Sequence, residues 1–165
     1  MVRLGFSNLA DLVPRALGAY DLQLSYDPAL LRLDAVHFGD PLYGDQLDLS
    51  GFGTWSLSDA AIPGMVRVLE LSFDDASLLN SAQRRHFGLA SLFFQAQSAG
   101  TSPLTVQVNM LADAGGFPME GSTMNGAVTV TPEPGMFVLA GTGLAALGVW
   151  RRKRYFPRMS AFRFP

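Results

Sequence analysis

Residues 20–27 read Tyr-Asp-Leu-Gln-Leu-Ser-Tyr-Asp, and this stretch decides the fold class of the chain. Apolar and polar side chains alternate in it with a period of two, as in a strand with one buried and one exposed face. The tyrosines and leucines would therefore face the core. Pro28 follows directly and has no amide hydrogen to donate to a sheet, so we expect the strand to end at Asp27.

Other strand patterns lie on both sides of this stretch. Residues 31–37 alternate and then change apolar parity at Val36, which indicates a β-bulge. Residues 66–73 are apolar at both parities, as in a strand that is covered on both faces. Three further strands are predicted at residues 90–96, 104–110 and 128–130, and Met110 would share the inward face of the second of these with Leu104, Val106 and Val108.

Turns rich in Gly, Asp, Ser and Pro separate these segments at residues 40–45, 62–64, 99–103 and 112–121. Several short strands at this spacing predict an all-β fold, an antiparallel β-sandwich or jelly roll. We expect helix to be limited to one or two turns within residues 75–85. Leu78, Leu79 and Phe87 would anchor this helix as a lid at one end of the sandwich.

Charge is distributed unevenly along the chain. Residues 1–131 hold thirteen of the fourteen acids and six arginines, a formal charge of −7. Residues 132–165 hold six basic residues and one acid, a formal charge of +5. Such asymmetry indicates contact with a membrane or a polyanion at one end. Because the folded part would repel phosphate, we expect no nucleic-acid partner.

Few residues are available for chemistry. The chain has no cysteine, two histidines and one lysine, so a disulfide framework and a thiolate metal site are excluded. Asp74 and Asp75 are adjacent, which favours a solvated turn over a catalytic carboxyl pair. We interpret His37 and His86 as structural, and no Gly-x-Ser-x-Gly motif is present. We therefore predict no catalytic residue and a protein that is not an enzyme.

Two further groups of residues were weighed as binding sites. Asp40, Asp45, Asp48 and Asp113 lie in loops and leave calcium open as a ligand, although solvated acids are the commoner case. We expect no cofactor and no metal site. Stacking on sugar rings is open to three aromatic residues, Tyr43, Phe52 and Trp55, which could equally belong to the core.

The C-terminal tail contains three features in order. Pro132, Glu133 and Pro134 precede an uncharged segment, residues 136–150, which Arg151, Arg152, Lys153 and Arg154 follow. We predict a single short transmembrane helix at 136–150, where fifteen residues reach about 22 Å against a hydrocarbon core of about 30 Å. The basic cluster would stay cytoplasmic and orient the acidic domain outside. An ordinary membrane anchor is the alternative.

This tail resembles the PEP-CTERM sorting signal. The resemblance implies recognition by exosortase, a membrane protease of Gram-negative bacteria, with Pro132, Glu133 and Pro134 as the positions that carry over. Residues 19–31 and 92–112 resemble cohesin-like domains, which implies a β-sandwich that binds a dockerin-like protein. Polysaccharide is a second possible partner.

The expected organisation has three parts. Residues 1–131 form a cohesin-like β-sandwich, residues 132–154 the sorting signal with its membrane helix, and residues 155–165 a basic aromatic extension. We expect an exported, non-catalytic binding or extracellular-matrix module. It would be anchored in the inner membrane on the periplasmic side and would then reach the cell surface or be secreted. A structural coat protein is the first alternative, and a secreted glycan hydrolase the second.

The two ends of the chain depart from this pattern. Residues 1–10 contain no sustained apolar stretch and no small-residue cleavage site, so no signal peptide is recognisable. We expect that the sandwich is truncated at its N-terminus and that residues 2–6 are part of a first strand. Residues 155–165 extend past the arginines, and their aromatic and basic side chains would suit a membrane interface, although unselected coding sequence would look the same.

Overall fold

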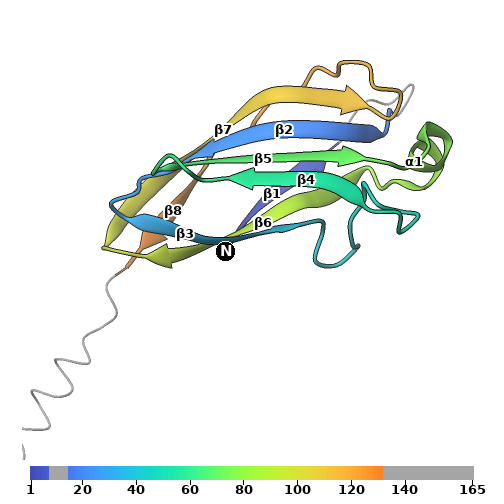
Figure 1. The fold of residues 1–165 in the computed structure, drawn as a ribbon. Helices are drawn as coiled ribbons and strands as arrows, with labels where there is room; N and C mark the ends of the chain where they lie inside the picture. Colours follow the sequence, from blue (N-terminus) through green and yellow to red (C-terminus); the bar gives the residue numbers. More distant parts are fainter. Residues whose placement is uncertain (8–14, 132–165) are drawn as a thin grey trace, which may run out of the picture. The chain divides into compact units, whose positions relative to one another are not determined.

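Two antiparallel sheets face each other in the computed structural model (Figure 1). It describes residues 1–7 and 15–131, so the predicted sorting signal, membrane helix and extension lie outside the described residues. The elements are β1 (Val2–Ser7), β2 (Leu17–Ser25), β3 (Leu31–Phe38), β4 (Thr54–Asp59), β5 (Met65–Ser72), α1 (Ala76–Ala82), β6 (His86–Ala96), β7 (Gly100–Asp113) and β8 (Gly126–Val130). The predicted all-β antiparallel sandwich is confirmed.

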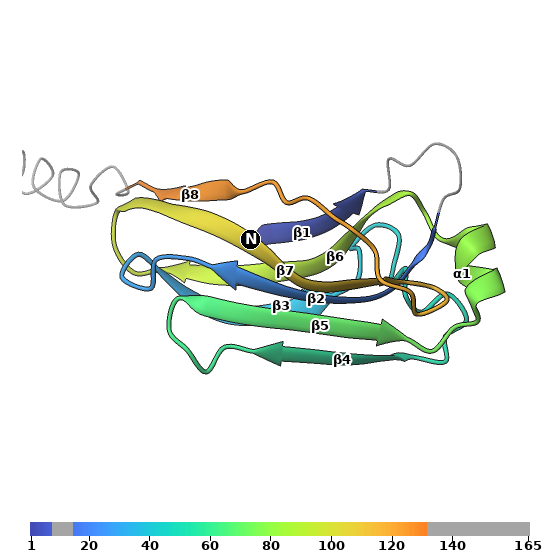
Figure 2. The same ribbon diagram turned by 90° about the horizontal axis from the view of Figure 1, so that it is seen from above.

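The sheets differ in width. One has three strands in the order β1-β6-β3, and the other has five in the order β4-β5-β2-β7-β8. Figure 2 shows the wider sheet from above, with β4 and β8 toward opposite edges. Within each sheet, neighbouring strands run antiparallel. Because three strands oppose five, part of the wide sheet has no layer of the narrow sheet across from it.

Strand β2 occupies the middle of the wide sheet and supplies the centre of the core. Tyr20, Leu22 and Leu24 are buried as predicted, and the strand ends at Ser25, before Pro28. Side chains of β5 and β6 complete this centre, among them Val66, Val68, Leu89 and Leu92. The alternation in residues 20–27 therefore identifies both the strand and the face that it buries.

The bulge that the sequence predicts in residues 31–38 is present. Pairing of β3 with β6 shifts by one residue between Leu33 and Ala35. Leu31 and Leu33 before the shift, and Val36 and Phe38 after it, all pack toward the core. The extra residue reverses the parity of the strand, which lets apolar side chains on both parities reach one face.

Two predictions about strand faces were wrong. Residues 66–73 do not form a strand covered on both faces, because Leu71 and Phe73 are exposed to 42% and 61%. Met110 does not share the inward face of Val108, since the pairing of β2 with β7 shifts between Asp21 and Leu22 and turns Met110 outward. The outer apolar side chains of these strands remain exposed within the described part of the chain.

Helix α1 lies at one end of the sandwich, as predicted (Figure 1). Leu79 is its buried residue, and Phe87 is buried at the start of β6. Polar side chains after and within the helix tie it to the start of β2: Asn80 accepts a hydrogen bond from the Ala16 amide, and Gln83 from the Leu17 amide. The helix therefore closes this end through both apolar and polar contacts.

A buried carboxyl joins three strands of the wide sheet. Glu70 of β5 is 1% exposed and points into the core. The Tyr20 hydroxyl donates to one of its oxygens at 2.8 Å, and the Thr54 hydroxyl donates to the other at 2.8 Å. Burial, with the nearby Asp45 carboxylate adding to it, raises the pKa of Glu70 to about 7. Glu70 is thus a structural acid that carries a proton below neutral pH.

We predict that this group makes stability depend on pH. The unfolded chain releases the Glu70 proton near its ordinary pKa, whereas the folded chain holds it until about pH 7. The free energy of unfolding should therefore fall as pH rises through this window, by on the order of 3 kcal/mol. In Glu70→Gln this fall should vanish, as measured by urea unfolding at a series of pH values. The exposed Glu120→Gln variant is the control, and an unchanged slope in Glu70→Gln would refute the assignment.

Candidate binding surface

The outer face of the wide sheet gathers exposed apolar side chains from three strands. Trp55 and Leu57 of β4, Leu71 of β5 and Met110 of β7 are exposed to 53%, 43%, 42% and 46%. We call these four residues the apolar strip. Trp55 pairs with Leu71 across the β4–β5 ladder, while Leu57 pairs with Leu69, whose partner in β2 is Asp21, opposite Met110. The register therefore places the strip across the sheet in two adjacent rows.

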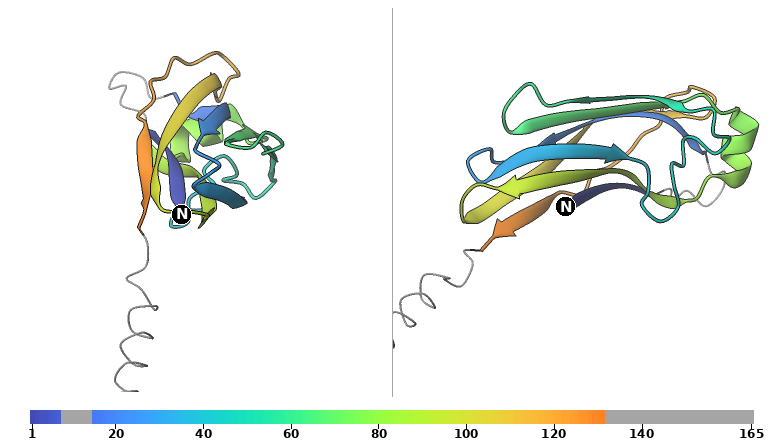
Figure 3. Two further views of the ribbon diagram at one scale, coloured as in Figure 1. Left: turned by 90° about the vertical axis from the view of Figure 1, so that its left-hand side faces the viewer. Right: turned by 60° about the horizontal axis from the view of Figure 1, so that its bottom comes forward.

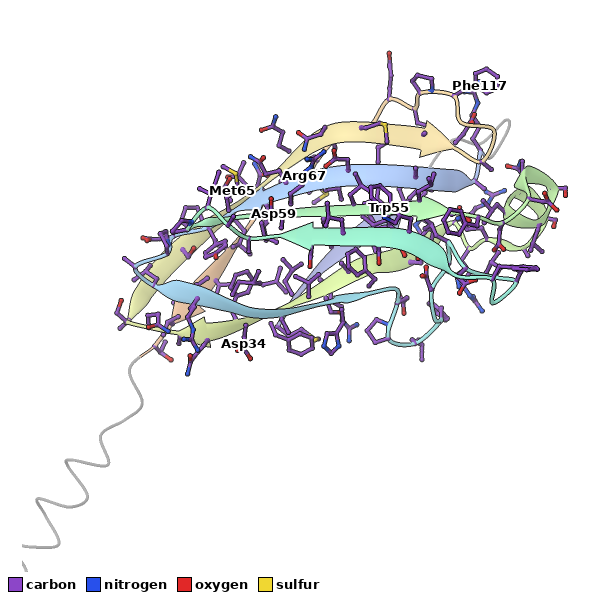
Figure 4. The ribbon with its side chains drawn as sticks, viewed as in Figure 1. Asp34, Trp55, Asp59, Met65, Arg67 and Phe117 are labelled. Carbon is purple, nitrogen blue, oxygen red and sulfur yellow. The ribbon has the colours of Figure 1, made fainter. Side chains whose placement is uncertain are left out.

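The strip follows from the parity of two neighbouring strands. Trp55, Leu57 and Asp59 have the same parity in β4 and pair with Leu71, Leu69 and Arg67 of β5. Figure 4 labels Trp55, Asp59 and Arg67 on these strands. Successive side chains of a strand point to opposite faces, so all six lie on the face away from Val66, Val68 and Glu70. This second face explains why residues 66–73 are apolar at both parities.

A charged pair lies on the same face and interrupts the strip, because Asp21 stands between Leu69 and Met110. Nε of Arg67 donates to Oδ1 of Asp21 at 2.8 Å, and its NH2 nitrogen donates to Oδ2 at 2.5 Å. Asn109 adds a third hydrogen bond to Asp21 at 3.1 Å. Asp21 is 6% exposed, whereas Arg67 keeps about half of its side chain in solvent. This two-point contact fixes the orientation of the guanidinium group.

The same contacts change the protonation of Asp21. The Arg67 guanidinium hydrogen-bonded to it lowers the pKa of the Asp21 carboxyl, and Asn109 adds to this effect. Burial acts in the opposite direction and is outweighed. Asp21 therefore stays ionised at neutral pH, and the outer face carries a fixed ion pair next to its apolar strip.

The three aromatic residues predicted as ligand contacts lie on two different elements. Trp55 is on β4, as part of the apolar strip. Tyr43 and Phe52 lie in the connection between β3 and β4, and the guanidinium carbon of Arg84 sits 4.0 Å from the Tyr43 ring centroid. All three are exposed, so none of them belongs to the core. Their role in binding stays a prediction.

The acids considered for calcium act as turn acceptors. Asp40 accepts hydrogen bonds from the amides of Gly88 and Leu42, and the Gly88 amide lowers the pKa of its carboxyl. Asp48 accepts from the Gly53 amide. Asp113 accepts from the amides of Gly115 and Phe117. Across residues 1–7 and 15–131, no group of three or more acidic or histidine side chains is placed to hold a metal ion.

Sequence reasoning missed most of this surface. The sequence pattern does not indicate Leu57 or Leu71 as surface residues. It predicts Met110 on the inward face and gives no sign of the Asp21–Arg67 pair. One signal in the sequence could have indicated this surface. A strand that buries one face needs apolar residues at one parity only, so the odd-numbered apolar residues in 66–73 indicate a second apolar face. The partners of that strand could not be read from its own pattern.

Comparison with known proteins bears on the tail and the fold separately. Residues 130–153 match the PEP-CTERM protein-sorting motif. The chain is similar in structure to the seventh ScaB type I cohesin of Pseudobacteroides cellulosolvens, with a TM-score of 0.62 and 16% identity over 81% of this chain and 83% of that one. The chain carries a PEP-CTERM motif beside a cohesin fold.

Two other cohesins show the same likeness. The CaCohA2 module of Clostridium acetobutylicum has a TM-score of 0.53 and 23% identity, over 74% of this chain and 77% of that one. A non-cellulosomal cohesin of Archaeoglobus fulgidus has a TM-score of 0.52 and 17% identity, over 73% and 76%. No curated protein matches the chain. At these identities the likeness to cohesins establishes the fold alone.

The PEP-CTERM motif spans the predicted sorting tripeptide, the apolar segment and most of the basic cluster. The membrane helix predicted at residues 136–150 falls outside the described residues. Within residues 1–7 and 15–131, no helix is long and apolar enough to cross a membrane.

We predict that Arg67 controls the titration of Asp21. In Arg67→Ala the pKa of Asp21 should rise, because the charge and two hydrogen bonds that favour its ionised form are removed. Carbon-13 NMR of the Asp21 carboxyl measures this directly. Arg32→Ala, which removes an exposed hydrogen bond to Gln95 on the narrow sheet, is the control.

The same variant should respond differently to acid. A lowered pKa in the folded state gives stability that is present above the ordinary pKa of aspartate and is lost as pH falls through the lowered value. Arg67→Ala should therefore lose less stability on acidification than the unmodified chain does. An unchanged Asp21 titration in this variant would show that the ion pair does not form in solution.

Proposed function

We propose that this chain is an exported, non-catalytic binding module that recognises a protein partner through the outer face of its wide sheet. The apolar strip is the observation that carries this proposal. Exposed apolar side chains that gather on one face among polar groups are typical of sites that another protein covers. Here Asp59 and Gln23 border the strip, and Asp21 of the Asp21–Arg67 pair lies between Leu69 and Met110.

The geometry of the face suits such binding. Its side chains project from hydrogen-bonded strands, so little backbone freedom is lost when a partner docks. Trp55 supplies a large aromatic surface, and tryptophan and arginine are enriched among residues that dominate binding energy. The guanidinium group of Arg67 is already held flat by Asp21, which supports stacking by a partner side chain.

The chemistry of cohesins in complexes points to a class of partner. One similar structure is a complex of a type I cohesin with a dockerin from Clostridium thermocellum, and another is a complex of the sixth cohesin of Acetivibrio cellulolyticus scaffoldin B with the Cel5 dockerin. A dockerin-like protein is therefore our proposed partner for this chain. Polysaccharide is the second candidate, because the exposed Trp55 ring on a flat face could stack on a sugar.

The tail gives the proposed route of export. An exosortase-type membrane protease would recognise Pro132, Glu133 and Pro134, while Arg151 to Arg154 hold the cytoplasmic side of a helix at 136–150. The prolines favour an extended backbone that a protease cleft reads as a strand. The acidic domain would be anchored on the periplasmic side and then released to the cell surface or medium.

A non-enzymatic role is supported by the position of the acids. Glu70 and Asp45 are two carboxyls that interact, but Glu70 is 1% exposed and lies between the sheets. A glycan chain could not reach it without opening the core. The main alternative to a binding module is a coat protein, which has only a structural role at the surface.

We predict that Trp55 and Leu71 are required for retention of the chain on the extracellular matrix. The full chain should be retained saturably on a matrix fraction from an exopolysaccharide-producing host, and Trp55→Ala with Leu71→Ser should weaken retention at least about tenfold. Phe117→Ala is the matched control, because Phe117 is an exposed aromatic residue in the connection between β7 and β8. Equal retention of all three chains would favour the coat protein.

Pretreatment of the matrix distinguishes a protein ligand from a polysaccharide ligand. Protease digestion of the matrix fraction should abolish retention if the partner is a protein. Retention that survives protease and is lost after periodate oxidation would instead identify polysaccharide as the ligand, and would replace the dockerin-like partner in this proposal.

Processing at the tripeptide is tested by the mass of the mature protein. In a host with the sorting protease, the chain should lose the residues after the tripeptide, whereas a host without the protease should keep them. A variant with Pro132→Ala and Pro134→Ala should remain full length in both hosts. An intact tail beyond Arg154 in both hosts for the unmodified chain would contradict sorting by this route.

A further inference from the structure

An apolar groove runs along β1 on the inner side of the sandwich. The cavity has a volume of about 690 Å³. Its floor is formed by leucine and valine side chains of the wide sheet, chiefly Leu22, Leu24, Leu104, Val106 and Val108. Its two walls are β1 and residues 119–126, the connection that leads into β8. Figures 2 and 3 show β1 beside this connection.

The groove exists because the sheets differ in width. β1 is the last strand of the narrow sheet on this side, while the wide sheet continues through β7 to β8. Val106 and Val108 of β7 therefore remain only partly buried although their side chains belong to the inner face. The wide sheet presents more apolar surface here than β1 covers.

One edge of the groove is the backbone of β1, and the other is an irregular segment. β1 pairs with β6 along one side, and no described strand pairs with its other side. Residues 120–125 form no ladder with any described strand, and the Asn125 side chain accepts a hydrogen bond from the Val106 amide. An unpaired edge of this kind offers a row of amide and carbonyl groups to an added strand.

We propose that this groove binds one extended peptide strand from a partner protein, which pairs with the free edge of β1. Val2, Leu4 and Phe6 alternate toward the core with Arg3, Gly5 and Ser7 outward. A strand beside β1 would follow the same period and place every second side chain in the cavity. The site lies on the inner face and is therefore separate from the apolar strip.

The lining defines the chemistry of the peptide. The floor is aliphatic, so the inward positions of the peptide would be valine, leucine or isoleucine. Met119 and Met124 form part of the wall, and methionine adapts to side chains of different shape. Two charged residues line the groove, Arg3 on the outward side of β1 and Glu120 in the opposite wall. Glu120 and the charge of −7 over residues 1–131 favour basic residues at the outward positions that face this wall.

Strand β4 provides an internal comparison. It is also an edge strand, pairing with β5 alone among the described strands. Its side chains from Trp55 to Asp59 are all exposed, and none of its residues lines the groove beside β1. A free edge without a groove offers hydrogen bonds but no burial, so a peptide should bind β1 and leave β4 unpaired.

Hydrogen exchange of the full chain tests the proposal. The chain is held in mild detergent and mixed with the peptide Lys-Val-Thr-Val-Lys-Val-Thr-Val, capped at both ends. Exchange of amides in residues 2–7 and 120–125 should slow at least about tenfold at millimolar peptide, while β4 amides should not change. A peptide methylated at alternate backbone nitrogens is the control and should have no effect, because it cannot complete the ladder.

Substitutions test whether the peptide binds in the groove. Val106→Arg puts a charge on the floor and Met124→Arg puts one on the exposed wall, where it also repels the lysines of the peptide, so each should weaken peptide binding at least about tenfold. Leu57→Arg, on the outer face, should bind the peptide like the unmodified chain. Met124→Arg keeps the test decisive if Val106→Arg fails to fold, since Met124 is 94% exposed.

Three results would overturn the proposal. The first is the absence of slowed exchange in β1 at millimolar peptide. The second is equal slowing by the methylated peptide, which would show apolar binding without strand pairing. The third is protection of β4 in place of β1, which would assign the peptide to a bare edge and leave the groove without a role.

Discussion

Burial of every second side chain of β2 is the constraint on which the rest of the structure depends. Tyr20, Leu22 and Leu24 enter the core from the middle of the wide sheet. A shift of one residue would place Asp21 in the core, at the cost of a buried charge. Asp21 is instead met on the outer face by Arg67 and Asn109, from the two strands that flank β2. One strand thus fixes the register of its neighbours on both faces.

The sequence predicts those features that depend on a strand's own pattern. The alternation in residues 20–27 identifies β2 and its inward face, and the parity change near Val36 identifies the bulge in β3. Met110 shows the limit, because the shift that turns it outward arises in the pairing of β7 with β2. The ion pair of Asp21 with Arg67 was equally hidden, since the two residues meet only when their strands become neighbours. The role of Tyr43 and Phe52 also depends on loop geometry that periodicity does not encode.

The described domain presents two apolar surfaces with different character. The strip on the outer face offers side chains, whereas the groove on the inner face offers a backbone edge and a cavity. Both arise from sheet arrangement, one from apolar residues at both parities of β5 and the other from unequal sheet widths. A chain with a PEP-CTERM motif and a cohesin fold thus presents two apolar surfaces on which we propose that partners bind.

Hydroxyl-radical footprinting of the matrix-retained chain tests the central claim most directly, that the outer face of the wide sheet is the binding surface. Tryptophan and methionine oxidise readily, and Trp55 and Met110 both lie on this face. We expect oxidation of both to fall when the chain is retained on the matrix, while oxidation of the exposed Phe117 does not change. Equal oxidation of Trp55 and Met110 in the free and retained chains would contradict it.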